Sequence, residues 1–153
     1  MPNNKDDKTT EKPATRDHGY VLDEQIGYLL RKAYQRNAMI FSEKMQSGLT
    51  PTQFAVMARL DELGSVSQNQ LGRHAGLDVA TTKGVVDRLR ARGLVETARD
   101  PNDRRRQIVS LSKEGAEHFR HNAKLGLEIS TDTLAPLTAT ERSTLLRILK
   151  KLQ

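Results

Sequence analysis

Two short helix signatures follow one another in the middle of the sequence, separated by a turn that contains glycine. Ser67-Gln68-Asn69-Gln70 is predicted to be a capping box that opens the first helix, and Gly76 ends that helix. Asp78 is predicted to cap the second helix, which Gly93 ends. Two capped helices joined by such a turn are typical of a helix-turn-helix.

Before this pair, the sequence predicts two further helices. Apolar residues recur at mostly helical spacing from Leu22 to Met45, which indicates one long helix ending at Gly48. Thr50-Pro51-Thr52-Gln53 is a capping box with a proline start, so it opens another helix. That helix is expected to bury Phe54, Met57, Leu60 and Leu63.

After the pair, the sequence predicts a β-hairpin. Leu94–Arg99 and Gln107–Leu111 favour strands, and the residues between them, Asp100–Arg106, are too polar for any core. A hairpin with a basic tip, directly behind a helix-turn-helix, makes a winged helix-turn-helix.

The last part of the chain is predicted to be helical. Ser112 caps a long helix that Pro136 breaks, and Thr138-Ala139-Thr140-Glu141 is a further capping box. The final helix is expected to turn Leu145, Leu149 and Leu152 inward. The predicted fold class is therefore mainly α with a small β-hairpin wing.

The composition narrows the classes of function. The chain of 153 residues has 25 Lys and Arg against 19 Asp and Glu, and bases outnumber acids between Arg73 and Arg106. A local basic excess is the footprint of a polyanion-binding surface, although an ordinary solvated surface gives the same pattern. The absence of cysteine excludes disulfides, thiolate metal sites and thiol-based sensing.

Other sequence signals argue against catalysis and membrane insertion. The chain has no metalloprotease, P-loop, dinucleotide-binding or serine-hydrolase motif, so we predict neither an enzyme nor a cofactor. No run approaches the roughly 20 apolar residues of a membrane span, and Met1–Asp17 is polar rather than signal-like. A cytoplasmic protein is expected.

The second helix of the central pair presents small residues on the side opposite its apolar face. Ala80 and Gly84 would let this helix enter the major groove of DNA, where Thr81 and Arg88 reach base edges or phosphates. The alternative is close packing against another helix. The candidate DNA contacts of this helix are Ala80, Thr81, Thr82, Lys83, Gly84, Asp87 and Arg88.

The hairpin tip supplies a second set of candidate DNA contacts, Asp103, Arg104, Arg105 and Arg106. Arginine is always charged and suits the strongly negative potential of a narrow minor groove. We expect Asp103 to hold one of these arginines by a charge-assisted hydrogen bond. A solvated turn is the alternative interpretation.

Two runs of sequence resemble the MarR family of bacterial transcription regulators. They are Gly76–Thr82 with Val85–Leu89 and Arg92–Val95, and Asp100–Arg106 with Val109–Gly115. The resemblance extends from about Leu22 to the C-terminus, with Ser112 where the family often has threonine. Within the family, Asp78–Leu89 is similar to regulators of aromatic and heteroaromatic acid catabolism, and of nicotinate degradation in particular.

This resemblance implies a homodimeric repressor that binds a palindromic double-stranded DNA operator and is released by a small aromatic or heteroaromatic acid, best a hydroxynicotinate. It implies a tail at 1–19, a dimerisation helix at 20–48, a DNA-binding domain at 49–111 and C-terminal dimerisation helices at 112–153. The tail is expected to be disordered. The alternatives are a dimeric winged scaffold for protein partners, whose binding would not depend on salt, and an enzyme.

A planar acid needs an aromatic wall and a polar or cationic group in an otherwise apolar cleft. The candidate effector contacts are His18, Tyr20, Tyr28, Arg31, Tyr34, Phe54, Met57 and Arg59, each with interface packing or a solvated surface as its alternative. His118 and His121, close to Glu114 and Glu117, have a spacing that could bind a metal. Because such pairs are usually surface residues, we predict no metal site.

Overall fold

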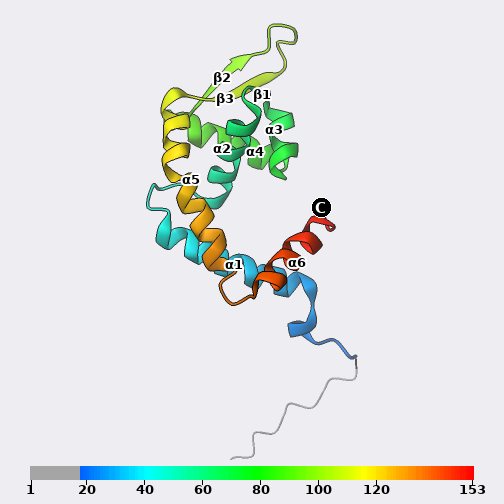
Figure 1. Ribbon diagram of the computed structural model, residues 1–153. Coiled ribbons are helices and arrows are strands. Elements are labelled where there is room, and N and C mark those ends of the chain that lie inside the picture. The colour runs from blue at the N-terminus through cyan, green and yellow to red at the C-terminus, as the bar shows by residue number, and fades with distance from the viewer. Residues whose placement is uncertain (1–17) are drawn as a thin grey trace, which may run out of the picture. The chain divides into compact units, whose positions relative to one another are not determined.

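The structure is a computed structural model that describes residues 18–153, and the chain divides into two compact units. The first unit, up to Ala33, contains the short 3-10 helix η1 (Leu22–Glu24) and the beginning of α1 (Ile26–Lys44). The second, Tyr34–Gln153, contains the rest of α1 and all later elements (Figure 1). Most of the predicted tail, 1–19, lies outside the described residues.

The later elements follow the predicted order, with one addition. They are α2 (Pro51–Leu63), β1 (Val66–Ser67), α3 (Gln68–Ala75), α4 (Val79–Ala91), β2 (Val95–Arg99), β3 (Gln107–Leu111), α5 (Lys113–Thr133) and α6 (Ala139–Lys150). The addition is β1, which the sequence does not reveal because a strand of two residues has no periodicity of its own.

The prediction that the first long helix runs to Gly48 is wrong, because α1 ends at Lys44. Gly48 has a φ of 75°, a backbone conformation that favours glycine, so the chain turns there before Thr50 caps α2. Arg92, at the C-terminal end of α4, donates hydrogen bonds to the carbonyls of Ser47 at 2.8 Å and Gly48 at 3.2 Å. The connection between α1 and α2 is therefore tied to the end of α4.

The predicted helix caps are confirmed, with one capping box incomplete. Thr50 and Thr138 each make both hydrogen bonds of a capping box, and Asp78 and Ser112 cap α4 and α5. At Ser67 only half of the predicted box forms: its Oγ accepts from the Gln70 amide and donates to Gln70 Oε1. The Gln70 side chain is thereby directed to a hydroxyl rather than to the Ser67 backbone.

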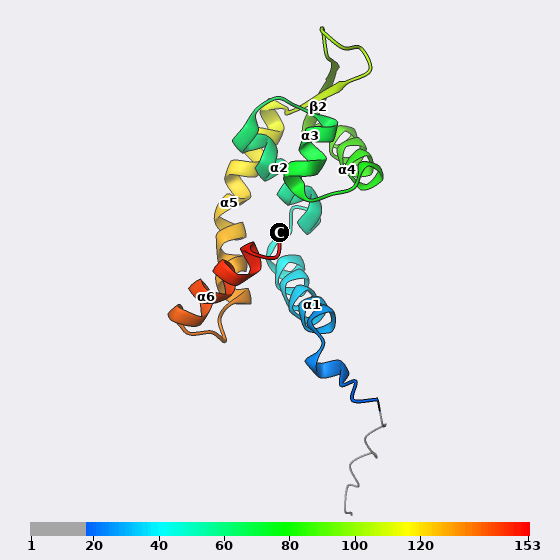
Figure 2. The same ribbon diagram turned by 90° about the vertical axis from the view of Figure 1, so that its right-hand side faces the viewer.

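The core of the second unit lies where α2 contacts α3, α4 and α5 (Figure 2). Its most deeply buried apolar side chains are Val56, Met57, Leu60, Leu71, Val86, Leu89 and Val109. Leu63, which was predicted to join this stripe, is 41% exposed, whereas Val56 is fully buried. Leu63 is the last residue of α2, where the helix leaves the core.

The sheet has the strand order β1-β3-β2, and all its pairs are antiparallel. Val66 lies opposite Val109, and Val95 lies opposite Leu111. A Cβ atom at Gly115 would lie 1.8 Å from the Leu94 carbonyl oxygen, so only glycine allows α5 to begin this close to the start of β2. The base of the hairpin is therefore fixed against α5.

The prediction that the final helix turns its leucines inward is wrong within one chain. No residue of α6 is buried, and Leu145 and Leu152 are 36% and 66% exposed. Within the second unit, the described residues do not cover the apolar side of this helix. The physical reason is that a leucine periodicity predicts a buried face without stating which molecule covers it.

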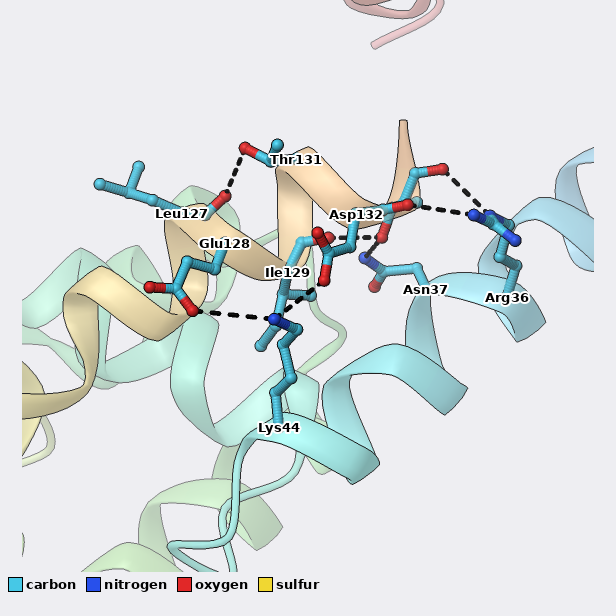
Figure 3. Close-up of polar contacts among 9 residues, drawn as sticks. Arg36, Asn37, Lys44, Leu127, Glu128, Ile129, Thr131 and Asp132 are labelled. Carbon is cyan, nitrogen blue, oxygen red and sulfur yellow. Dashed lines mark hydrogen bonds and ion pairs between the residues drawn. The ribbon is translucent and has the colours of Figure 1, made fainter. Parts of the chain in front are cut away.

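Polar contacts join the C-terminal end of α5 to the part of α1 in the same unit (Figure 3). Arg36 donates to the carbonyls of Asp132 at 3.0 Å and Thr133 at 3.1 Å, which belong to the last turn of α5. Lys44 Nζ lies 2.9 Å from Asp132 Oδ2 and 3.7 Å from Glu128 Oε2. The hydrogen bond to Asp132 is the main cause of a raised pKa for Lys44.

Among residues 18–153, no helix combines the length and apolar character that crossing a membrane requires.

Candidate DNA-binding surface and effector groove

The start of α4 is fixed by Asp78. One carboxylate oxygen of Asp78 accepts from the Thr81 amide at 2.7 Å, and the other accepts from the Thr81 hydroxyl at 2.9 Å. These bonds favour the charged carboxylate, and the backbone bond from Thr81 is the largest cause of the lowered pKa of Asp78. The charged form of Asp78 therefore stabilises the first turn of α4.

Most of the predicted α4 contacts lie on its open side, but Thr82 does not. Ala80, Thr81, Lys83 and Arg88 are exposed. Thr82 is 1% exposed, and its hydroxyl donates to the Asp78 carbonyl at 2.7 Å. The prediction of Thr82 as a DNA contact is wrong, because its side chain is buried and its hydroxyl is satisfied inside the helix.

Within the described part of the chain, no second helix packs against the small residues of α4. Of the residues that the structure describes, only Arg88, through Nη1 at 3.6 Å, would place a side-chain atom within 4 Å of a Cβ atom built at Gly84, and Ala80 is exposed. Close helix packing, the alternative explanation for this face, is therefore not seen among the described residues. The face is open to a partner outside the chain.

Asp87 on this side of α4 is neutralised by its neighbours. Its carboxylate lies 2.5 Å from Lys83 Nζ and 3.4 Å from Arg90 Nη2. The hydrogen bond from Lys83 is the largest cause of the lowered pKa of Asp87. An approaching phosphate would therefore meet a paired carboxylate rather than an isolated negative charge.

The tip of the wing is ordered by backbone hydrogen bonds rather than by the predicted aspartate–arginine pair. Asp103 Oδ1 accepts from the Arg105 amide at 3.0 Å, and the Asp103 carbonyl accepts from the Arg106 amide at 2.9 Å. The expectation that Asp103 holds an arginine side chain is wrong. Arg106 instead lies 3.7 Å from Asp100, at the base of the turn.

A separate apolar groove of about 440 Å³ lies in the second unit. It is lined by Asn37, Phe41, Pro51, Phe54, Phe119, Ala123, Gly126, Leu127, Ile129 and Ser130. The Phe54 ring lies 6.0 Å from that of Phe41 and 5.3 Å from that of Phe119. A Cβ atom at Gly126 would lie 2.9 Å from Phe54 Cε1, so the glycine keeps room beside this ring.

Of the predicted effector residues in the second unit, only Phe54 lines this groove. Met57 is fully buried in the core, and Tyr34 is 57% exposed. Arg59 donates to the His74 carbonyl at 2.9 Å and pairs with Glu62 at 2.6 Å, beside α3. The structure therefore does not bring Met57, Tyr34 or Arg59 to the aromatic wall.

The remaining effector candidates, His18, Tyr20, Tyr28 and Arg31, belong to the first unit. The Arg31 guanidinium and the Lys32 ammonium lie 5.6 Å and 5.5 Å from the centre of the Tyr28 ring. Such distances are typical of cation–π contacts. His18 Nδ1 accepts from the Tyr20 amide at 3.1 Å.

Most of the groove could not be found from the sequence, because its residues come from segments far apart in the chain. Phe119 and Gly126 on α5 could have been found from the helical spacing of small and aromatic residues, but Asn37 gave no signal.

The groove has polar atoms at Asn37 and Ser130 and no cationic side chain among its lining residues. Asn37 Nδ2 already donates to Thr133 Oγ1 at 3.0 Å.

The histidine pair on α5 does not form part of a metal site in this structure. His118 is partly buried and His121 is exposed. Over the described range 18–153, no group of three or more His, Asp or Glu residues is arranged to hold a metal ion.

The sequence resembles known transcription regulators over nearly its whole length. The profile of the MarR family matches residues 49–106. The transcriptional repressor NicR of Pseudomonas putida is 40% identical over 147 residues, which cover 95% of this chain and 93% of NicR.

Solved structures share the fold as well as the sequence. A probable transcriptional regulator from Pseudomonas aeruginosa is 47% identical, with a TM-score of 0.83 over 87% of this chain and 100% of that one. BpsR of Bordetella bronchiseptica, whose DNA binding is regulated by 6-hydroxynicotinic acid, is 34% identical, with a TM-score of 0.82 over 87% and 96%. A mutant of MarR from E. coli, complexed with operator DNA, is 26% identical, with a TM-score of 0.76 over 82% and 91%.

The winged fold, the open face of α4 and these matches agree with the expectation drawn from the sequence. Members of the matched family regulate transcription and are not enzymes. The chain belongs to the MarR family of transcriptional regulators.

Proposed function

We propose that this protein is a cytoplasmic homodimeric repressor that places α4 in the major groove of a palindromic operator and the wing in the adjacent minor groove. The observation that carries the proposal is the open small-residue face of α4. Within residues 18–153, Ala80 and Gly84 have no packing partner there, and Thr81, Lys83 and Arg88 lie at its flanks. A helix with small outward residues approaches base edges closely enough for direct contacts.

The residues divide by the chemistry that each offers. The proposed major-groove contacts are Ala80, Thr81, Lys83, Gly84 and Arg88, with Asp87 orienting Lys83 through their ion pair. In the wing, Asp103 orders the turn through the Arg105 amide, and the Arg105 side chain is left to enter the minor groove beside Arg104.

Dimerisation is proposed from the apolar surface that the single chain leaves exposed. Leu145 and Ile148, three residues apart on one side of α6, are 36% and 44% exposed, and Leu29 and Leu30 on α1 are 47% and 41% exposed. Exposed apolar side chains gathered on a helix in this way mark an interface. A second copy with two-fold symmetry covers identical faces and presents two winged regions to a palindrome.

The proposed effector is a small aromatic or heteroaromatic acid, and a hydroxynicotinate is the best candidate. Support comes from the similarity to BpsR and from the groove around Phe54, which offers three aromatic rings to a planar ligand. Release from DNA requires that the acid bind more tightly to a conformation that does not bind the operator.

The DNA-binding proposal is tested with duplexes that the full-length protein selects from a random library. Replacing Arg105 with alanine is expected to weaken binding to the selected operator by about 1–3 kcal/mol. Lys124→Ala, an exposed position on α5, is the matched control and should leave binding unchanged. Unchanged affinity of the Arg105 variant at several salt concentrations would refute the assignment of the wing.

The effector proposal is tested by adding a panel of hydroxynicotinates and benzoates to the operator complex. An active acid should raise the melting temperature of the free protein and weaken operator binding. Gly126→Val, which fills the groove beside Phe54, should abolish both effects and leave operator affinity without acid intact. If no acid in the panel changes either quantity, the effector class is wrong.

A further inference from the structure

We propose that a polar groove between α5 and the end of α1 binds a small organic cation with N–H donors, such as a primary ammonium. The groove has a volume of about 600 Å³ and is called the α1–α5 groove. Its lining includes Lys44, Ser47, Glu114, Glu117, His118 and Asn122. No lining residue comes from α3, α4 or the wing, so the inference goes beyond the proposed function.

The α1–α5 groove is separate from the groove around Phe54. Glu117 and His121 line the α1–α5 groove, whereas Phe119 and Ala123 line the other. Because an α-helix turns by about 100° per residue, these two pairs lie on opposite sides of α5. The lining of the α1–α5 groove contains no phenylalanine or tyrosine, so it does not offer the aromatic wall that is proposed for the acid effector.

The uncompensated charge of the α1–α5 groove is negative. Among residues 18–153, neither Glu114 nor Glu117 has a basic nitrogen within 4.0 Å. Lys44, which also lines the groove, is already held by Asp132 at 2.9 Å and by Glu128 at 3.7 Å (Figure 3). Two carboxylates without a bound cation attract a positively charged ligand and repel an anion.

The same groove contains hydrogen-bond acceptors that lack donors. Asn122 is 7% exposed, and its Nδ2 donates to the His118 carbonyl at 2.8 Å, which leaves Oδ1 without a partner among the described residues. Ser47 Oγ and His118 Nε2 are buried, and in the part of the chain that the structure describes neither has a hydrogen-bond partner. A buried polar atom without a partner is destabilising, so rotation of either side chain toward an entering donor is favoured.

These groups select the chemistry of the ligand. Carboxylates and the Asn122 carbonyl only accept hydrogen bonds, a hydroxyl can accept one, and a neutral imidazole that carries its proton on Nδ1 accepts at Nε2. A primary ammonium brings three N–H donors together with one positive charge. It therefore matches both the acceptors and the carboxylates, whereas a quaternary ammonium supplies only the charge.

Binding in the α1–α5 groove should affect the bend between α1 and α2. A donor held by the Ser47 hydroxyl would restrict the same residue whose carbonyl accepts from Arg92 at 2.8 Å. Amide hydrogen exchange in this bend is therefore expected to slow when the ligand binds.

The test uses the full-length protein without DNA and three small ions of similar size: butylammonium, tetramethylammonium and butyrate. Each is titrated by isothermal calorimetry at constant ionic strength. Butylammonium should bind about tenfold more tightly than tetramethylammonium, which has no N–H donor, and than butyrate, which has the opposite charge. Hydrogen exchange followed by mass spectrometry should slow in the bend and in the first half of α5, and not in α3 or the wing.

Variants locate the binding within the groove. Glu117→Gln removes one carboxylate at nearly constant size and should weaken the binding of butylammonium about tenfold. Asn122→Leu removes the amide acceptor and should weaken it as well; because Asn122 is buried, the exposed Glu117 decides if the Asn122 variant does not fold. Glu43→Gln, which removes the same charge from an exposed position of α1 outside the groove, is the control and should bind as the wild type does.

Three outcomes would overturn the inference. Equal affinities for butylammonium and tetramethylammonium would show attraction by charge alone. Unchanged binding by Glu117→Gln would place the ligand elsewhere. No heat and no change in exchange with butylammonium would show that the unpartnered acceptors do not form a ligand site. None of these measurements involves operator DNA, so the proposed function stands or fails separately.

Zinc chloride tests a different kind of cation. Zinc alone is not expected to slow exchange in the groove, because residues 18–153 contain no cluster of three or more His, Asp or Glu residues arranged to hold a metal ion. If zinc slows exchange there and butylammonium does not, the groove binds a metal and the assignment to an organic cation is wrong.

Discussion

The winged region, from α2 to β3, and the final helix, α6, have similar patterns of apolar residues. Only the winged region buries these residues within the chain. In the winged region Leu71, Val86 and Leu89 are completely buried, whereas on α6 Leu146 is 48% exposed and just after it Leu152 is 66% exposed. The winged region therefore completes its core within one chain. The leucines of α6 have a comparable sequence pattern but require a surface from elsewhere, which the proposed dimer supplies.

The largest effect is expected where the core is complete. Leu89→Ala removes a fully buried side chain and should lower the free energy of unfolding by about 3 kcal/mol, through reduced burial and the cavity left behind. Chemical denaturation followed by circular dichroism measures it. Leu63→Ala, at a position that is 41% exposed, is the control and should cost less than about 1 kcal/mol.

Substitutions that place charges on the apolar side of α6 test whether this helix forms the dimer interface. Replacing Leu145 and Ile148 together with aspartate should raise the dissociation constant of the dimer about 100-fold, or about 2.7 kcal/mol, because charges would enter an apolar interface. Sedimentation velocity measures it, with Lys151→Asp as the control. A variant that stays dimeric would show that the apolar face of α6 is not the dimer interface.

The two complete capping boxes, at Thr50 and Thr138, allow the winged region and α6 to be compared with the same substitution of threonine by alanine. Thr50→Ala should reduce the global free energy of unfolding by about 1 kcal/mol, because α2 contributes to the core. Thr138→Ala should instead speed hydrogen exchange within α6 and leave the winged region unchanged, since α6 buries no residue in the chain. Equal effects on global unfolding would contradict the division into two regions.

The smallest effect concerns acid stability. The pKa of Asp78 and that of Glu141 are both lowered, chiefly by backbone hydrogen bonds from Thr81 and Thr138 respectively. A lowered folded-state pKa contributes stability that is present above the unfolded value, about 4, and is lost as the pH falls through the folded value. Asp78→Asn should flatten the acid dependence of unfolding of the winged region, which denaturation at a series of pH values measures.

For Glu141→Gln, the corresponding change should appear only in exchange of the α6 amides. If both variants unfold with the acid dependence of the wild-type protein, the hydrogen bonds from Thr81 and Thr138 do not lower the pKa values of Asp78 and Glu141 in solution.

Local chemistry explains what could be predicted from the sequence. The caps at Thr50, Asp78, Ser112 and Thr138 depend on residues three positions apart, so a short stretch of sequence contains all the information. The polar run between Leu94–Arg99 and Gln107–Leu111 predicted the wing, and the resemblance to the MarR family agreed with that prediction. The open face of α4 followed from helical periodicity, because Ala80 and Gly84 lie opposite its buried stripe.

Pairing between distant segments explains what could not be predicted. The strand β1 exists because Val66 lies opposite Val109, and this pairing also moves Arg106 from the expected tip to the side of α3. The groove around Phe54 needs rings from three helices. Thr82 was misassigned because a threonine on a helix can satisfy its hydroxyl inside the helix, as it does here with the Asp78 carbonyl.

Through the guanidinium of Arg92, a structural change in one part of the second unit can be transmitted to another. This guanidinium joins the C-terminal end of α4 to two peptide carbonyls that lie 44 and 45 residues earlier in the chain. Those carbonyls belong to the bend between α1 and α2. Both of these helices also contribute lining residues to the groove around Phe54. A rearrangement of that bend would therefore be transmitted to the end of α4 through these two hydrogen bonds, and also through Met45 and Leu49, which flank the bend and are buried in the core.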